Sequence, residues 1–233
     1  MQFAEVFCRA DGIGHFRAWG ALLHELRETL FELSDARVTA VKTGWWAEEL
    51  IGLGQGRQRH PLTAALLGVE APWSALGRTL LERDLNELRA ADTAQAVAIL
   101  LPTAAAVVAV ESAIFQSEGS ADAERSLAVH WLLQRLPAGL EGDDRARIPM
   151  HLIARHGTIA GQHGAGKAQA LIRDWAAELA LAMPAGVAGA PMIRRSRHRF
   201  DQARLARLAA GKGFSEPSAG LTLWRAWRAA RSP

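Results

Sequence analysis

The sequence predicts an all-α, single-domain fold, and three observations lead to this prediction. Apolar residues recur three and four positions apart along nearly the whole chain, which is the helical period. No run of alternating β-branched residues indicates a strand. A chain of 233 residues with 49% apolar content can bury one sizeable core. We therefore expect a single helical domain over residues 1–233.

The positions of the helices follow from this period and from the residues that start and stop helices. The expected helices cover residues 16–33, 36–53, 59–68, 73–90, 93–116, 121–136, 148–155, 166–183, 196–210 and 219–230. Side chains able to cap an exposed helix start, and prolines suited to a first turn, stand at Asp35, Asp92, Ser120, Pro61, Pro72 and Pro149. The remaining segments are expected to be loops.

Cysteine content and apolar segments bear on location. Cys8 is the only cysteine, which excludes a disulfide framework and favours a reducing compartment. Glu5 and Arg9 interrupt the apolar stretch at the N-terminus, unlike a signal peptide. The longest apolar run, 96–110, is shorter than a bilayer-spanning helix and contains a proline. We expect a cytoplasmic protein, either free or peripheral at the inner face of a membrane.

Basic charge is concentrated at the C-terminal end. Segment 194–233 contains ten Lys and Arg residues and two acidic residues, which gives it a net charge of 10 − 2 = +8. Residues 1–193 therefore have a net charge of 3 − 8 = −5. Such a segment suits a solvated helix face or an anionic partner such as a lipid surface or a diphosphate. No nucleic-acid-binding motif accompanies it, so nucleic acid is not an expected partner.

The helix expected over 36–53 contains two adjacent tryptophans. Helical spacing places Lys42, Trp46, Glu49 and Leu53 on one face, and Val38, Val41 and Trp45 on the neighbouring face. We expect Trp45 to pack between helices with the valines. Trp46, which shares its face with charges, is expected to border a ligand cavity.

Several motifs in this order resemble the squalene and phytoene synthase family. They are ALLHEL at 21–26, KTGWWAEEL at 42–50 followed by GRQRHP, RIPMHLIARHG at 147–157 and LWRAWRAAR at 223–231, so the resemblance covers about residues 20–231. It implies an isoprenoid-synthase-like helical bundle around a central apolar cavity. It also implies head-to-head joining of two prenyl diphosphates, with Mg²⁺ held by two Asp-x-x-x-Asp helices.

The sequence departs from the family pattern at the metal site. No Asp-x-x-x-Asp is present, and Leu136 and Leu140 fall where the second aspartate pair belongs. The first site has only Glu28-x-x-x-Glu32, which makes Glu28 and Glu32 the candidate metal ligands. The resemblance further implies a substrate-binding set of Lys42, Trp46, Glu49, Arg135 and Arg145.

Two functions follow from the resemblance and this departure. The first is a catalytically degenerate family member that uses no cofactor and binds an isoprenoid, a prenyl diphosphate or another apolar partner, or acts in assembly. The alternative is an active prenyl diphosphate transferase whose atypical, Mg²⁺-dependent site uses Glu28, Glu32, Lys42, Arg135 and Arg145. The degenerate member is favoured, because leucine cannot ligate a hard cation.

Two further patterns are interpreted as structural. GQHGAGKA at 161–168 fits a phosphate-binding loop in part, but Ala168 replaces the hydroxyl residue and no strand precedes it, so an interhelical loop is expected. His151 and His156 lie five residues apart and on different helix faces, which is a poor metal-ligand spacing. A structural or surface role is expected for both.

Overall fold

The computed structural model describes residues 12–31, 35–82, 89–136, 148–157, 164–213, 220, 222–224 and 227–228. This part of the chain is all-helical, which confirms the predicted fold class. The helices are α2 (Ile13–Phe31), α3 (Ala36–Leu53), α4 (Pro61–Ala64), α5 (Trp73–Glu82), α6 (Thr93–Phe115), α7 (Ala121–Arg135), α8 (Met150–His156), α9 (Gly164–Ala182) and α10 (Met192–Ala209).

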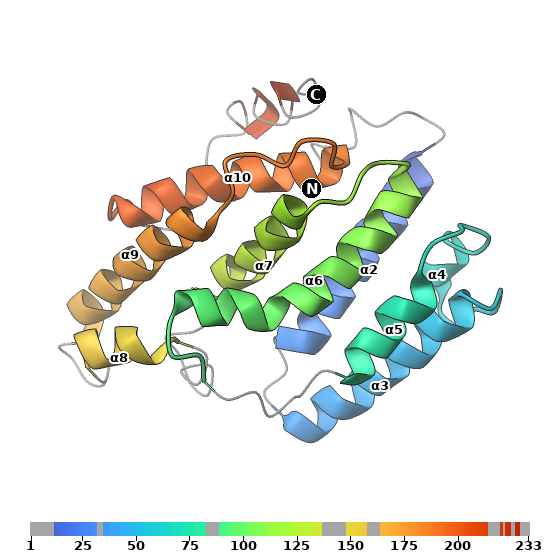
Figure 1. The fold of residues 1–233 in the computed structure, drawn as a ribbon, viewed down its shortest axis with the longest axis horizontal. Coiled ribbons are helices and arrows are strands. Elements are labelled where there is room, and N and C mark those ends of the chain that lie inside the picture. Colours follow the sequence, from blue (N-terminus) through green and yellow to red (C-terminus); the bar gives the residue numbers. More distant parts are fainter. Residues whose placement is uncertain are drawn as a thin grey trace.

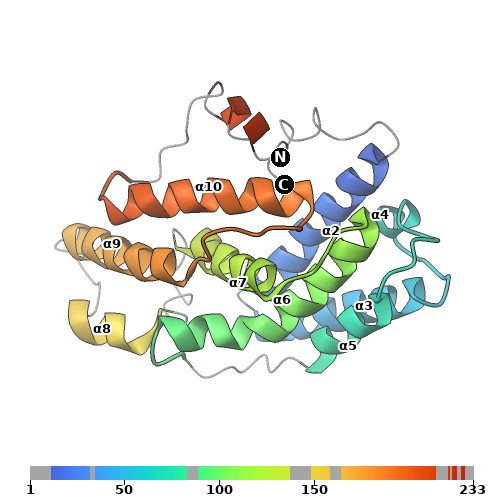
Figure 2. The same cartoon turned by 45° about the horizontal axis from the view of Figure 1, so that its top comes forward.

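The helices pack as two outer pairs with a central group between them. Helices α9 and α10 lie side by side at one edge, α3 and α5 pair at the opposite edge, and α2, α6 and α7 lie between the pairs (Figure 1). Figure 2 shows α10 running across α7 toward α2. A continuous apolar core joins the layers and includes Trp19, Trp46, Trp73 and Trp175, all nearly inaccessible. The expected central apolar cavity is not seen in the described residues.

Helices α3, α5, α6 and α7 begin at the residues that the sequence predicts. Asp35, Asp92 and Ser120 accept hydrogen bonds from first-turn amides as the N-caps of α3, α6 and α7. The helix expected over 59–68 is a single turn, α4. Helix α5 is described as far as Glu82, residues 83–88 of the expected helix lie outside the described residues, and residues 89–90 are not helical. The last predicted helix, 219–230, falls partly outside the described residues.

Helix α6 is long and apolar enough to cross a bilayer, by length and composition alone. Half of its apolar window is buried within the protein. It packs against α5, α7 and α9, and its buried Glu111 pairs with an arginine of α10. These contacts are those of a core helix.

Candidate functional site

The face of α3 that borders the core is the one with the charges, contrary to expectation. Trp46 is 2% exposed and belongs to the core, whereas Val38 and Val41 are 49% and 74% exposed. Trp45 is only partly buried: its ring lies edge-on to Trp46, with the guanidinium of Arg59 at 5.7 Å from its centroid. The structure therefore reverses the expected burial of the two rings, while the expected role of Trp46 in substrate binding stays a prediction.

Glu49 is buried beside Trp46 because it serves as an acceptor for the segment that follows α3. Its carboxylate accepts hydrogen bonds from the backbone amides of Arg59 (2.9 Å) and His60 (3.0 Å) and from the hydroxyl of Thr63 (2.5 Å). Burial raises the pKa of Glu49, but these hydrogen bonds outweigh it and the pKa lies below its ordinary value. The geometry gives Glu49 a structural contact that a sequence pattern of Trp-Trp-x-x-Glu does not reveal.

The other expected site residues make separate contacts. Lys42 Nζ donates to Glu28 Oε1 at 3.0 Å and lies 3.5 Å from Glu25 Oε2. The hydrogen bond and charge of Lys42 hold the pKa of Glu28 below its usual value. Buried Arg135 donates to the carbonyl of Phe31 at 2.7 Å and stacks on its ring. Glu32 and Arg145 lie outside the described residues.

A pocket of about 490 Å³ lies instead between α2, α7 and α10. Its lining residues share one face of α2 and one face of α7, at helical spacing, and a single position of α10. They are Phe16, Arg17, Gly20, Ala21, Leu23, His24 and Arg27 of α2, Leu127, His130, Trp131 and Gln134 of α7, and Arg197 of α10. Its volume falls within the range of ~300 to 1,000 Å³ that is common for small-molecule sites.

The pocket combines an apolar surface with a positive one. Phe16, Leu23, Leu127 and Trp131 supply buried apolar side chains, while Arg17, Arg27 and Arg197 bring guanidinium groups from two helices. Arg27 Nη2 donates to His24 Nδ1 at 3.1 Å. No carboxylate is among the described residues that line the pocket. An elongated ligand with an apolar body and an anionic end has complementary chemistry.

A buried ion pair links α6 to α10 and α2, two of the helices that line the pocket. Arg194 of α10 donates to Glu111 of α6 from Nε (3.0 Å) and from Nη2 (2.8 Å), and Trp19 of α2 donates to the same carboxylate at 2.9 Å. Arg194 and Glu111 are 2% and 0% exposed. These hydrogen bonds offset much of the loss of hydration of a buried charge pair, while Arg194 Nη1 has no hydrogen-bond partner within the described residues.

A second buried pair joins α7 to α10. His130 Nδ1 lies 2.8 Å from Asp201 Oδ2, and both side chains are buried. Burial lowers the pKa of His130 to about 4, outweighing the attraction of Asp201 for a proton on the ring. His130 is therefore neutral near pH 7, with its Nδ1 proton directed at the carboxylate.

Arg17, Arg27 and Arg197 place positive charge at the pocket. Such charge attracts an anion more strongly in a site of reduced dielectric constant than in water.

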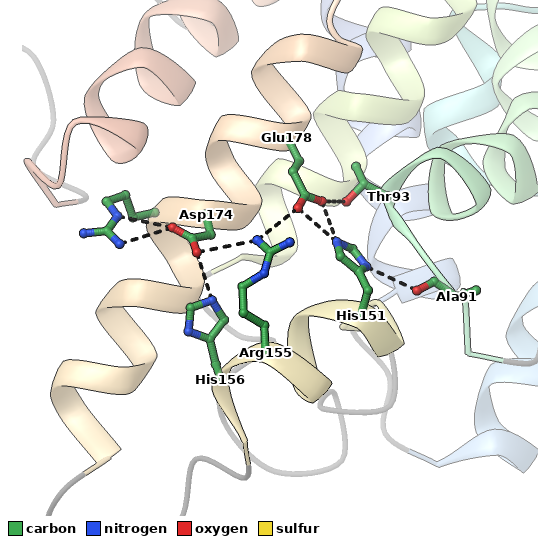
Figure 3. A network of polar contacts seen from close by, with 8 residues as sticks. Ala91, Thr93, His151, Arg155, His156, Asp174 and Glu178 are labelled. Carbon is green, nitrogen blue, oxygen red and sulfur yellow. Dashed lines mark hydrogen bonds and ion pairs between the residues drawn. The ribbon is translucent and has the colours of Figure 1, made fainter.

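A further polar network joins α8 to α9 (Figure 3). His151 Nε2 contacts Glu178 at 2.8 Å, His156 Nε2 contacts Asp174 at 3.1 Å, and Arg155 lies within 3.7 Å of both carboxylates. These partners, which the sequence analysis missed, agree with a structural role for the two histidines. The described residues contain no group of three His, Cys, Asp or Glu able to hold a metal ion.

Sequence comparison adds no relative to this picture, since no family model, curated protein or solved structure matches the chain. One signal for the pocket was nevertheless present. Arg194, Arg197 and Asp201 follow the spacing of one helical face, and the expected start of this helix at residue 196 split that face. Helix α10 begins at Met192, which places all three on one element.

Proposed function

We propose that this protein binds an apolar ligand with a phosphate or diphosphate head, the class that includes prenyl diphosphates, in the pocket between α2, α7 and α10. The observation that supports this proposal is that one pocket combines a basic wall, formed by Arg17, Arg27 and Arg197, with an apolar wall, formed by Phe16, Leu23, Leu127 and Trp131. The protein is then a squalene/phytoene synthase-like binding protein of isoprenoid-type metabolism, and it does not perform Mg²⁺-dependent prenyl transfer.

The three arginines that line the pocket support the anionic head, because a phosphate group has about two negative charges near neutral pH. The planar guanidinium fork of arginine pairs with phosphate oxygens through two hydrogen bonds. An apolar chain would lie along the side chains of Phe16, Leu127 and Trp131.

The surroundings of the aligned metal positions support the absence of prenyl transfer. Leu136 is fully buried in the apolar core and offers no oxygen donor. Glu28 already pairs with Lys42. Replacing Leu136 by aspartate would bury an unpaired carboxylate, so restoring the family's aspartates would damage the fold rather than repair a metal site.

Calorimetric titration tests the proposal with three probes: farnesyl diphosphate, farnesol and inorganic pyrophosphate. Farnesyl diphosphate should bind at least tenfold more tightly than either of the others, because only this probe has both a chain for the apolar side chains and a diphosphate for the arginines. EDTA should leave this affinity unchanged. Equal binding of farnesol would remove the role of the arginines, and no binding of farnesyl diphosphate would refute the proposal.

A matched pair of double variants locates the site. Arg17→Gln/Arg27→Gln should weaken farnesyl diphosphate binding at least tenfold, whereas Arg37→Gln/Arg78→Gln removes the same charge at exposed positions on α3 and α5 and should leave it unchanged. An equal loss in both would show a general charge effect. Mg²⁺-dependent condensation of two probe molecules to the cyclopropyl diphosphate, with release of one pyrophosphate, would establish the active transferase instead.

A further inference from the structure

His130 and Asp201 have the geometry of a proton-accepting pair at the wall of this pocket. The carboxylate of Asp201 faces Nδ1 at 2.8 Å, so the ring proton resides on Nδ1 and the lone pair resides on Nε2. No hydrogen bond of Nε2 is found within the described residues, and His130 lines the pocket. An oriented imidazole with a free lone pair beside a substrate pocket is the arrangement of a general base.

His24 has the complementary tautomer on the facing helix. Arginine can only donate, so the contact from Arg27 Nη2 to His24 Nδ1 makes Nδ1 the acceptor and places the ring proton on Nε2. The pocket thus holds one imidazole that accepts a proton and another that donates a hydrogen bond, together with Arg17 and Arg197. These groups can neutralise and orient a phosphoryl group without a metal ion.

We propose that this pocket hydrolyses the terminal phosphate of a bound diphosphate ester, with His130 as the general base and Asp201 as its positioning residue. The inference rests on the proposed function, because the arginines must first hold the diphosphate. It names a reaction different from prenyl transfer, in which the carbon–oxygen bond of the ester stays intact.

The reaction balances with water as the only co-reactant. A water oxygen forms a bond to the terminal phosphorus while the bond from that phosphorus to the bridging oxygen breaks, and the bridging oxygen keeps the electron pair. His130 Nε2 takes the proton from the attacking water and later releases it to solvent. The products are inorganic phosphate and the monophosphate of the apolar alcohol. Arg17, Arg27 and Arg197 offset the charge on the phosphoryl oxygens.

The charged and titratable groups around His130 set the pH dependence of this step. They are Asp201, Arg197 and Arg194 of α10, together with the pocket residues Arg17, His24 and Arg27 of α2. Burial and the nearby arginines keep the imidazole neutral and therefore available as a base. A bound anion acts in the opposite direction and strengthens the base.

The test is incubation of the full chain with farnesyl diphosphate and EDTA in ¹⁸O-labelled water, followed by phosphate detection and mass spectrometry. We expect inorganic phosphate carrying one ¹⁸O atom, together with farnesyl monophosphate. Farnesyl diphosphate that binds in the titration but releases no phosphate overturns this inference and leaves the proposed function standing. Absence of binding overturns both.

Three variants separate catalysis from folding. His130→Gln keeps a hydrogen-bond donor toward Asp201 and should lower kcat by about 100-fold or more with KM changed less than threefold. Asp201→Asn should also lower kcat. His198→Gln is the matched control, because His198 is a buried histidine of α10 that pairs with Ser126 and does not line the pocket. It should keep full activity.

The pH profile of the unmodified protein provides a readout that does not depend on any variant folding. Its kcat should fall tenfold per pH unit on the acid side as one group becomes protonated, and phosphate release that stays flat from pH 4 to pH 8 would contradict a histidine base. Where His130→Gln remains folded, its residual rate should lack this acid limb. Equal rates for this variant and the unmodified protein would overturn the role of His130.

Discussion

Arg194 and Glu111 are 83 positions apart in the sequence and form a two-pronged ion pair in the core, with Nε and Nη2 at 3.0 and 2.8 Å from the two carboxylate oxygens. The pair fixes the arginine-rich helix α10 against the apolar helix α6. Because Trp19 donates to the same carboxylate, α2 is tied to both. The buried carboxylate of Glu111 therefore holds together α2 and α10, the two helices that contribute arginines to the pocket.

Breaking this pair from one side should destabilise the protein severely. Glu111→Gln removes the charge that offsets Arg194, and we expect the free energy of unfolding in urea to fall by about 3 to 5 kcal/mol. The double variant Glu111→Met/Arg194→Met should lose less than either single variant. A loss below about 1 kcal/mol for Glu111→Gln, typical of an exposed pair, would contradict a buried and desolvated contact.

The two tryptophans of α3 should differ in their effect on stability. Trp46→Ala should lower the free energy of unfolding by about 3 to 5 kcal/mol, because it empties a core position. Trp45→Ala should cost about 1 to 2 kcal/mol, since this ring is only partly buried. Urea denaturation of both variants measures the difference. Neither change should alter farnesyl diphosphate affinity, since neither ring lines the pocket; an equal loss of stability in both would contradict the described packing.

Acid should destabilise the fold through His130. Its pKa of about 4 in the folded protein lies below the ordinary value of 6.5, so the unfolded chain binds the proton first. The stabilisation is complete above pH 6.5 and is lost as the pH falls from there toward 4, by up to about 1.4 kcal/mol per pH unit. Urea denaturation between pH 7 and pH 4.5 measures the slope.

His130→Gln should flatten this pH dependence without abolishing it. His198, whose pKa burial also lowers, contributes a loss of the same sign. The carboxylates with lowered pKa values, Glu28, Glu49 and Asp174, add a loss of the same sign only as the pH approaches their ordinary values of 4.5 and 3.8, at the acid end of this window. An unchanged slope in the variant would show that His130 is not the group responsible.

The C-terminal residues should bind an anionic membrane surface. Leu223, Trp224 and Trp227 are 43%, 49% and 41% exposed, and Arg228 lies over the ring of Trp224 at 4.9 Å. Aromatic and basic side chains together suit the lipid interface. Vesicles rich in phosphatidylserine should co-sediment the protein at low salt, and 0.5 M salt should release it.

Two variants distinguish this surface from general stickiness. Trp224→Ser/Trp227→Ser should reduce co-sedimentation at least threefold, whereas Leu181→Ser removes an apolar side chain that is 88% exposed on α9 and should have no effect. Binding to neutral phosphatidylcholine vesicles at the same level would contradict an electrostatic contribution.

Helices were predictable from the sequence where period and cap agree. Helix α3 begins after Asp35 and ends at Leu53 as expected, because the cap is local chemistry. The face that α3 buries was not predictable in the same way. Val38 and Val41 are more apolar than Glu49, yet Glu49 is the buried residue because the amides of Arg59 and His60, ten and eleven residues later, need an acceptor.

The buried contacts that hold the helices around the pocket could not be predicted, because they join residues far apart in the sequence. The His130–Asp201 and Glu111–Arg194 contacts join residues 71 and 83 positions apart, and no short spacing encodes them. The resemblance implied that Lys42, Glu49 and Arg135 bind substrate together. In the structure, Lys42 contacts Glu28, Glu49 contacts the 59–63 segment, and Arg135 contacts Phe31. The activity implied by the resemblance stays a prediction.

The long-range ion pair also dictates an order of assembly during synthesis. Helix α6 leaves the ribosome with Glu111 embedded among apolar side chains, and its partner emerges only 83 residues later. Until then the nascent chain has a carboxylate that cannot be buried, so the central helices must stay loosely associated or hydrated around it. Arrival of α10 supplies the arginine and closes the core. Arg197, the residue of α10 that lines the pocket, thus reaches its place in the same step.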